Sequence, residues 1–369
     1  MTWDSDALIS LLGQARLTQG SLLARVKRLG FGLGTEARSD ILTEEVLKTS
    51  AIEGERLDPN MVRSSVARHL GLKAAGLATP TRSVDGLVEV LLDATRGYGK
   101  EFSAARLKGW QAALFPTGYS GLHKIRAGRW RGDEPMRVVS GPLGREKVHF
   151  EAPPGDVVEG EMKAFLSWWR SSAGGMDGIL RAGLAHFYFV TIHPFEDGNG
   201  RIARALTDMA LAQDEKIETR YYSLSSQIMK ERSEYYDILE RCSKTDSTDL
   251  TRWLVWFLQC FIRAVRHSDT IIGTVLARSD FWQDHAQDDL NERQKKAINS
   301  ILEAGPGNFT GGLTTRKYVG MTKTSRATAF REISDLCDKK ILRQLSGKGR
   351  SVRYDLVWPD IKSEDDAER

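Results

Sequence analysis

Histidine, carboxylate and arginine side chains gather in one segment, His193-Pro-Phe-Glu-Asp-Gly-Asn-Gly-Arg-Ile-Ala-Arg204. Within it Gly198 and Gly200 flank Asn199, and these residue types adopt left-handed backbone angles more readily than others. Such a run predicts a concave loop whose backbone N–H groups bind an anion. The apolar spacing that follows predicts a helix, whose N-terminus would direct its positive dipole at the same anion. The segment therefore predicts a polyphosphate site.

The charged side chains of this segment indicate which reaction the phosphates would undergo. Arg201 and Arg204 would add two guanidinium groups to the site. Asp197 would hold Mg²⁺ at its edge, because one carboxylate together with phosphates commonly binds this ion. His193 would take a proton from an incoming hydroxyl group. A nucleotide, a magnesium ion and a base together favour the transfer of a phosphate-containing group.

The segment resembles the signature of the Fic family, His-x-Phe-x-(Asp/Glu)-Gly-Asn-Gly-Arg-x-x-Arg, and matches it at every fixed position. Most members of this family are helical enzymes that transfer AMP from ATP to a Ser, Thr or Tyr hydroxyl of a target protein. The resemblance covers about residues 107–261. It implies a mainly α fold with a helical bundle of the Fic type, ATP as co-substrate, Mg²⁺ as cofactor and a protein as target.

The resemblance also implies roles for single residues. His193 would be the general base, Asp197 would coordinate Mg²⁺, and Phe195 would pack the loop onto the core. The residues that it assigns to the nucleotide are Gly198, Asn199, Gly200, Arg201 and Arg204, with Tyr235 and Tyr236 near the adenine. Members that transfer phosphate or phosphocholine differ at the position of Gly200 or Gly198, so AMP is the favoured cargo.

A second motif, Thr49-Ser-Ala-Ile-Glu53-Gly54, matches the inhibitory pattern of the family, (Ser/Thr)-x-x-x-Glu-(Gly/Asn). Glu53 is expected at the end of a helix that Gly54 closes, where the helix dipole disfavours a negative charge without a cationic partner. The resemblance implies that this partner is Arg204 and that the pair excludes the γ-phosphate. In some members the same glutamate positions a water that removes AMP, so AMP removal is an alternative activity.

A β-hairpin is predicted over residues 136–151, where β-prone runs flank Ser140-Gly-Pro-Leu-Gly144. The resemblance implies that this hairpin is the flap of the family, which pairs with an extended stretch of the target. Its docking residues would be Arg137, Val138 and Val139.

Helical spacing of apolar side chains runs through most of the chain before residue 285. A loop is expected at Gly30–Gly34, a helix over Pro59–His69 after an Asp58 cap, and a boundary near Gly76–Thr81. His186 lies on an apolar helix and is interpreted as a hydrogen-bonded core residue, not as a base or metal ligand.

After Leu290, three short helical segments and a second hairpin predict a winged helix-turn-helix. Residues 313–355 contain eleven basic and four acidic side chains. Basic residues in the expected recognition helix (Arg326, Arg331) and wing (Lys348, Arg350, Arg353) fit the phosphates of duplex DNA. Winged helices also dock proteins, so both kinds of partner stay open.

The expected domains are an N-terminal helical module with the inhibitory helix (1–80), a Fic catalytic domain (81–285) and a winged helix-turn-helix (286–369). The N-terminal module would provide a dimer or packing surface.

Of 369 residues 41% are hydrophobic and 28% charged, which excludes a disordered chain. Three scattered cysteines exclude a disulfide framework, and the longest apolar run is too short for a membrane span. We therefore expect a cytoplasmic protein AMP transferase that Glu53 inhibits. The alternatives are an enzyme that removes AMP and a DNA-binding regulator whose Fic domain senses nucleotide.

Overall fold

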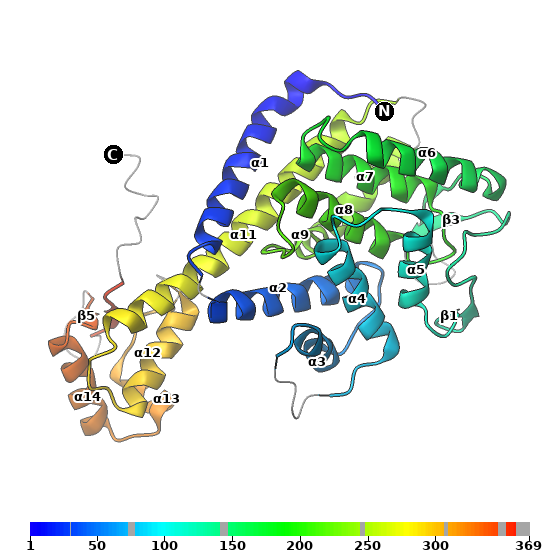
Figure 1. Cartoon of the computed structure of the whole chain (residues 1–369). Helices are drawn as coiled ribbons and strands as arrows, with labels where there is room; N and C mark the ends of the chain where they lie inside the picture. The colour runs from blue at the N-terminus through cyan, green and yellow to red at the C-terminus, as the bar shows by residue number, and fades with distance from the viewer. Residues whose placement is uncertain are drawn as a thin grey trace. The chain divides into compact units, whose positions relative to one another are not determined.

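A computed structural model describes the chain over residues 1–29, 31–72, 78–140, 147–243, 248–305, 309–345 and 352–358. The fold is mainly helical, as predicted (Figure 1). The chain forms two compact units, Met1–Ser268 and Asp269–Arg369. The domain limits expected from the sequence, at residues 80 and 285, stay predictions.

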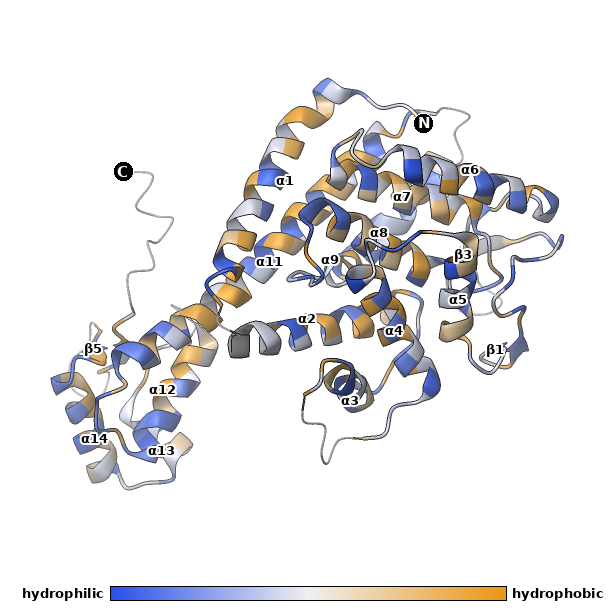
Figure 2. Ribbon diagram, in the orientation of Figure 1, coloured by the Kyte–Doolittle hydropathy of each residue, from blue (hydrophilic) through white to orange (hydrophobic). Residues whose placement is uncertain are grey.

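The first unit is built almost entirely from helices. They are α1 (Ser5–Val26), α2 (Phe31–Ile52), α3 (Pro59–His69), α4 (Arg82–Arg96), α5 (Ala104–Leu114), α6 (Val158–Ser171), α7 (Gly178–Ile192), α8 (Asn199–Glu215), α9 (Leu224–Lys230) and α10 (Arg232–Ser243), followed by α11 (Thr251–Asp284), which runs on into the second unit; a 3₁₀ turn (Gly155–Val157) precedes α6. Helices α7 and α8 pack closely together and are almost wholly buried. Figure 2 shows polar and apolar residues alternating along the surface helices, the pattern of amphipathic helices. Among the described residues, no helix is both long and apolar enough to span a membrane.

Helix boundaries follow local sequence signals in some places and tertiary packing in others. The predicted helix Pro59–His69 is confirmed, with the Asp58 side chain accepting a hydrogen bond from the backbone N–H of Asn60. The loop expected at Gly30–Gly34 is wrong, because α2 already begins at Phe31. Packing of α2 against α3 and α9 outweighs the helix penalty of about 1 kcal/mol for each glycine. The boundary expected near Gly76–Thr81 lies partly outside the described residues, which omit 73–77.

Short antiparallel strand pairs project from the first unit. The predicted hairpin is confirmed as β3 (Arg137–Ser140) and β4 (Lys147–Glu151), with an irregular register between Val138 and Val139. Its turn, residues 141–146, and the side chains of the predicted docking residues lie outside the part of the chain that the structure describes. A smaller pair, β1 (Tyr119–Ser120) and β2 (His123–Lys124), was not predicted, because two-residue strands carry no alternating pattern.

In the second unit, helices α12 (Glu292–Ala304), α13 (Thr315–Thr322) and α14 (Arg326–Asp338) precede an antiparallel pair, β5 (Leu342–Gln344) and β6 (Tyr354–Leu356). Leu313, between α12 and α13, exchanges both backbone hydrogen bonds with Tyr354, at 2.7 and 2.8 Å. Apolar side chains from all these elements share one core. The expected wing turn, with Lys348 and Arg350, lies outside the described residues.

Candidate functional site

The loop between α7 and α8 places the signature residues at the N-terminus of a buried helix. His193 ends α7 with a left-handed backbone (φ 50°), and Gly198 precedes α8 with φ 89°. Asn199 and Gly200 already belong to the helix, so only Gly198 of the Gly-Asn-Gly run uses a left-handed conformation. A Cβ at Gly198 would also lie 2.9 Å from Cε2 of Phe115. The first N–H groups of α8 are therefore available to an anion.

Side chains of the loop itself and of a neighbouring segment hold this geometry. The Asn199 amide donates to the carbonyl oxygen of Phe195 (2.7 Å) and accepts from its N–H (2.9 Å). Phe195 is completely buried, with its ring centroid 4.8 Å from that of Trp130. Arg131 was not predicted from the sequence; its buried side chain donates from Nε to the carbonyl oxygen of His193 (2.8 Å) and also donates to that of Pro153. No local pattern marks Arg131, because its acceptors are backbone groups distant in sequence.

The His193 imidazole is oriented and kept neutral. Its Nδ1 lies 3.3 Å from the carbonyl oxygen of Val190, and an N–H there would donate to that oxygen. The lone pair of Nε2 would then be free to accept a proton. Burial lowers the pKa of His193 to about 4, although the Val190 carbonyl and the Glu53 carboxylate both oppose this shift. At neutral pH the ring is therefore in the form that a general base requires.

Arg204, on the first turns of α8, is held by the segment that ends α2. Its Nη2 lies 2.7 Å from Oε1 of Glu53 and 2.9 Å from the carbonyl oxygen of Thr49, and its Nε donates to the Thr49 hydroxyl (2.6 Å). Burial raises the pKa of Glu53, but attraction to Arg204 outweighs it and leaves the pKa below the usual value. Glu53 is therefore ionised and paired at neutral pH.

Arg201 is held separately from Arg204. Its Nη1 lies 3.0 Å from Oε2 of Glu55, and its guanidinium sits over the Phe115 ring, 4.9 Å from the centroid. Among the described residues, no acceptor bonds Nε of Arg201 or Nη1 of Arg204, although both atoms are buried. Buried donors without acceptors are costly, and an anion in the site would supply the missing acceptors.

Asp197 lies at the edge of the same loop, with its side chain 40% exposed. Its Oδ1 accepts from the N–H of Gly198 (2.5 Å), and its Oδ2 accepts from the Ser120 hydroxyl. Asp197 borders a cleft of about 700 Å³ that is also lined by Glu53, Glu55 and Arg201. Within the described part of the chain no group of three or more His, Cys, Asp or Glu side chains could hold a metal. A single carboxylate in an open cleft fits Mg²⁺ only when phosphates complete the coordination.

The tyrosine pair lies on α10, next to the end of α2. The hydroxyl of Tyr235 shares a hydrogen bond with Nε2 of His186 (2.9 Å), and Nδ1 of His186 contacts the Thr207 hydroxyl (2.9 Å). Burial lowers the pKa of His186 to about 3, so it is a neutral core residue, as interpreted from the sequence. Tyr236 donates to the carbonyl oxygen of Ile52 at 3.4 Å. Contact of either tyrosine with adenine stays a prediction.

Comparisons with known proteins agree with this geometry. Residues 101–211 match the Fic/DOC family, and residues 1–72 match a domain of unknown function (DUF4172). A protein adenylyltransferase Fic of Nematostella vectensis is 31% identical over 153 residues, 40% of this chain and 31% of that protein. The Drosophila virilis protein of the same name is 31% identical over 183 residues, 47% of this chain and 36% of that protein. The chain thus matches about a third of the length of these relatives. A solved Fic family protein from Desulfovibrio desulfuricans G20 covers 97% of both chains with a TM-score of 0.54 and 19% identity, which shows a shared fold.

Proposed function

We propose, from the premise that the chain is a Fic family protein with its Fic domain at residues 101–211, that it transfers AMP from Mg·ATP to a hydroxyl side chain of a target protein. The observation that carries the proposal is the convergence of His193, Asp197, Arg201 and Arg204 around the N-terminus of α8, with two buried arginine N–H groups that lack acceptors among the described residues. The curated relatives are named protein adenylyltransferases.

The N-terminus of α8 and both arginines would bind the phosphate chain. The free N–H groups after Gly198 favour negative charge, and the guanidinium groups of Arg201 and Arg204 can donate to phosphate oxygens. Asp197 would hold Mg²⁺, which when bound neutralises charge on the phosphates. These contacts would fix the α-phosphate beside His193 before the target arrives.

His193 would act on the target hydroxyl. Its Nε2 takes the hydroxyl proton while the oxygen forms a bond to the α-phosphorus of ATP. The bond from the α-phosphorus to the bridging oxygen breaks, and pyrophosphate leaves with the electron pair. The low pKa of His193 makes the base available at neutral pH. The hairpin of β3 and β4 is the proposed dock for the target strand, with Arg137, Val138 and Val139 on it.

Glu53 is the proposed inhibitor of this reaction. Its ion pair with Arg204, at 2.7 Å, occupies the guanidinium that would bind the γ-phosphate. The two bonds from Arg204 to Thr49 support the same arrangement. Without the γ-phosphate contact, the α-phosphate would be poorly aligned with His193, and transfer would be slow.

Two assays test the proposal. The mass of the purified protein is measured after incubation with Mg·ATP, and lysate proteins are incubated with the enzyme and Mg·ATP that carries ³²P in its α-phosphate. The Glu53→Gly variant should gain one AMP or label lysate proteins far more than wild type, and Glu53→Gly/His193→Ala should do neither. If the Glu53→Gly variant labels neither itself nor any lysate protein, AMP transfer is refuted. Loss of label from a pre-modified protein on adding wild type, but not Glu53→Gly, would instead support AMP removal.

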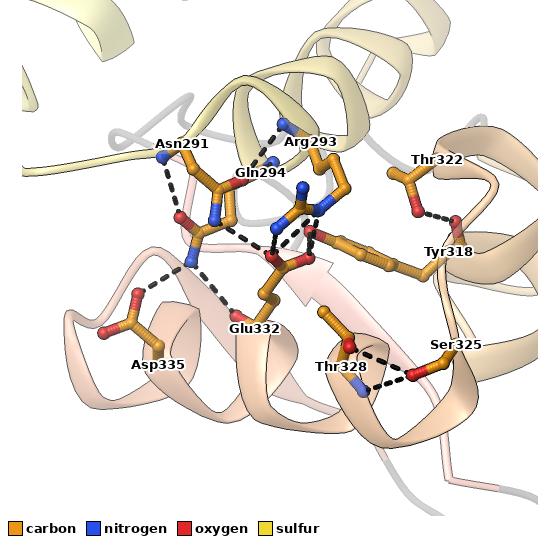
Figure 3. Close-up of polar contacts among 9 residues, drawn as sticks. All are labelled: Asn291, Arg293, Gln294, Tyr318, Thr322, Ser325, Thr328, Glu332 and Asp335. Carbon is orange, nitrogen blue, oxygen red and sulfur yellow. Dashed lines mark hydrogen bonds and ion pairs between the residues drawn. The ribbon is translucent and has the colours of Figure 1, made fainter.

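The second unit suggests a further activity, binding of duplex DNA. Its order of elements, with Leu313 paired to Tyr354, supports the proposal of a winged helix-turn-helix, in which α14 would be the recognition helix. Two of the three acidic side chains of α14 contact neighbouring helices: Glu332 pairs with Arg293 and Tyr318, and Asp335 accepts from Gln294 (Figure 3). The third, Asp338, is exposed at the C-terminal end of the helix.

These contacts leave a basic and apolar exposed face on the N-terminal half of α14. Arg326 and Arg331 are exposed, as is 61% of Phe330 between them. Arginines can neutralise DNA phosphates, and an exposed aromatic ring can contact a thymine methyl group. The unit is therefore a candidate DNA-binding module of this chain.

Duplex binding measured against salt concentration tests this candidate. Arg326→Ala/Arg331→Ala should weaken binding and reduce the slope of log affinity against log salt by about 2, roughly one unit for each phosphate that an arginine no longer neutralises. Lys296→Ala removes an exposed lysine of α12 and is the matched control. Binding that changes neither with salt nor on loss of the two arginines would contradict DNA binding by α14.

A further inference from the structure

A second carboxylate reaches the phosphate-binding arginines from the same short segment as Glu53. Gly54 separates Glu53 from Glu55 and has a left-handed backbone, with φ 86°. The N–H groups of Glu53 and Glu55 both donate to the carbonyl oxygen of Ser50, at 3.1 and 3.0 Å. This tight turn closes α2 and directs two carboxylates, two residues apart, to one side.

Each carboxylate bonds a different arginine of α8. Glu53 bonds Arg204 at 2.7 Å, and Glu55 bonds Arg201 at 3.0 Å. The Arg201 side chain is only 10% exposed and is fixed over the ring of Phe115. Its guanidinium can therefore exchange one anionic partner for another but cannot easily turn away. A phosphate that binds Nη1 of Arg201 must displace Glu55.

The two contacts differ in how easily they open. Both carboxylates line the cleft of about 700 Å³. The side chains of Glu55 and Arg201 are 44% and 10% exposed, and those of Glu53 and Arg204 are 32% and 2% exposed, so the pair of Glu55 is the more open one. The pair of Glu55 with Arg201 can exchange with water and is screened by salt. Even so, Glu55 occupies one of the donors of Arg201, and its charge repels phosphate.

We propose that Glu55 is a second inhibitory residue, which holds Arg201 as Glu53 holds Arg204. This inference rests on the proposed role of α8 in binding ATP. Removal of Glu53 then frees only one of the two arginines, and nucleotide binding in that variant is still limited by Glu55.

The experiment is calorimetric titration of the full-length protein with a non-hydrolysable ATP analogue and Mg²⁺. Wild type, Glu53→Gly, Glu55→Ala and the double variant are compared. The double variant should bind about three- to tenfold more tightly than Glu53→Gly, the range expected for removing a partly exposed charge from an arginine. Glu55→Gln in the same background should give a smaller gain, and high salt should shrink both gains.

Glu101→Ala in the Glu53→Gly background is the matched control, because it removes an exposed carboxylate that does not line the cleft. Equal or weaker affinity of the folded double variant, relative to Glu53→Gly, would overturn the role of Glu55. An affinity gain without any AMP transfer would support Glu55 and refute the proposed function. AMP transfer without the gain would refute only Glu55.

Discussion

The Glu53 carboxylate occupies the space that a side chain at Gly200, at the start of α8, would fill. A Cβ built on Gly200 would lie 2.1 Å from Oε1 of Glu53, far inside contact distance. The carboxylate can rest against the helix and reach Arg204 only because position 200 has no side chain. The same bare backbone is what the proposed phosphate contact requires, so the inhibitor and the nucleotide use one surface.

Gly200→Ala should displace the Glu53 carboxylate, because that carboxylate is the end of a flexible side chain and moves more readily than the helix. Loss of its bond to Arg204 should lower the free energy of unfolding by about 1.5–3 kcal/mol, the range for hydrogen bonds to charged groups. In the Glu53→Gly background the loss should vanish, since alanine is otherwise the better helix former. Urea unfolding of wild type, Gly200→Ala, Glu53→Gly and the double variant measures the coupling energy between the two positions. An equal loss of unfolding free energy in both backgrounds would show that the alanine side chain does not contact the Glu53 carboxylate.

The pH dependence of AMP transfer should reflect the buried state of His193. A general base works when deprotonated, and burial lowers the pKa of this histidine to about 4. Initial rates of the Glu53→Gly variant should therefore show no loss from His193 titration between about pH 8 and 6, and should fall only as the pH approaches the lowered pKa. A rate that is half-maximal near pH 6.5, the usual value for histidine, would contradict the assignment. Label transfer from ATP over this range provides the measurement.

The two tyrosines of α10 should differ in their effect on stability. Tyr235→Phe leaves Nε2 of the buried His186 without its partner and should cost about 1–3 kcal/mol of unfolding free energy. Tyr236→Phe removes a longer bond, of 3.4 Å, to the carbonyl oxygen of Ile52 and should cost less than about 1 kcal/mol. Chemical unfolding of both variants tests the order. A larger loss for Tyr236→Phe would mean that the contact of Tyr235 with His186 contributes little.

The position of the inhibitory helix should depend on Glu45, two turns before Glu53 on α2. Glu45 is buried and accepts from the Ser223 hydroxyl (2.6 Å) and the N–H of Ser225 (3.2 Å), at the start of α9. Glu45→Ala should loosen this anchor and raise affinity for a non-hydrolysable ATP analogue, but by no more than Glu53→Gly does. Should the melting temperature fall while nucleotide affinity stays at the wild-type value, Glu45 would stabilise the fold without holding Glu53 in place.

Local signals account for what could be predicted from the sequence. Asp58 before a proline is a helix cap, and it marks a helix start in the structure. The helical start of α8 after Gly198 follows from the same kind of short-range chemistry.

The residues that sequence reasoning missed depend on partners far along the chain. Arg131 bonds the backbone of His193, and Glu55 bonds Arg201, 146 positions later. Arg131 has no neighbour in sequence that would mark it, and Glu55 follows the inhibitory motif but lies outside its pattern. The early start of α2 at Phe31 is a tertiary effect of the same kind, because packing against α3 and α9 overrides the glycines.

The shared surface at Gly200 has a genetic consequence. A side chain at this position would displace the Glu53 carboxylate. It would also fill the space proposed for the phosphate. A selection for constitutively active alleles should therefore recover substitutions in residues 49–55, or in anchors of α2 such as Glu45, and none at Gly200. Loss of regulation is expected from changes in the segment that covers the loop and in its anchors, not from added bulk at the start of α8.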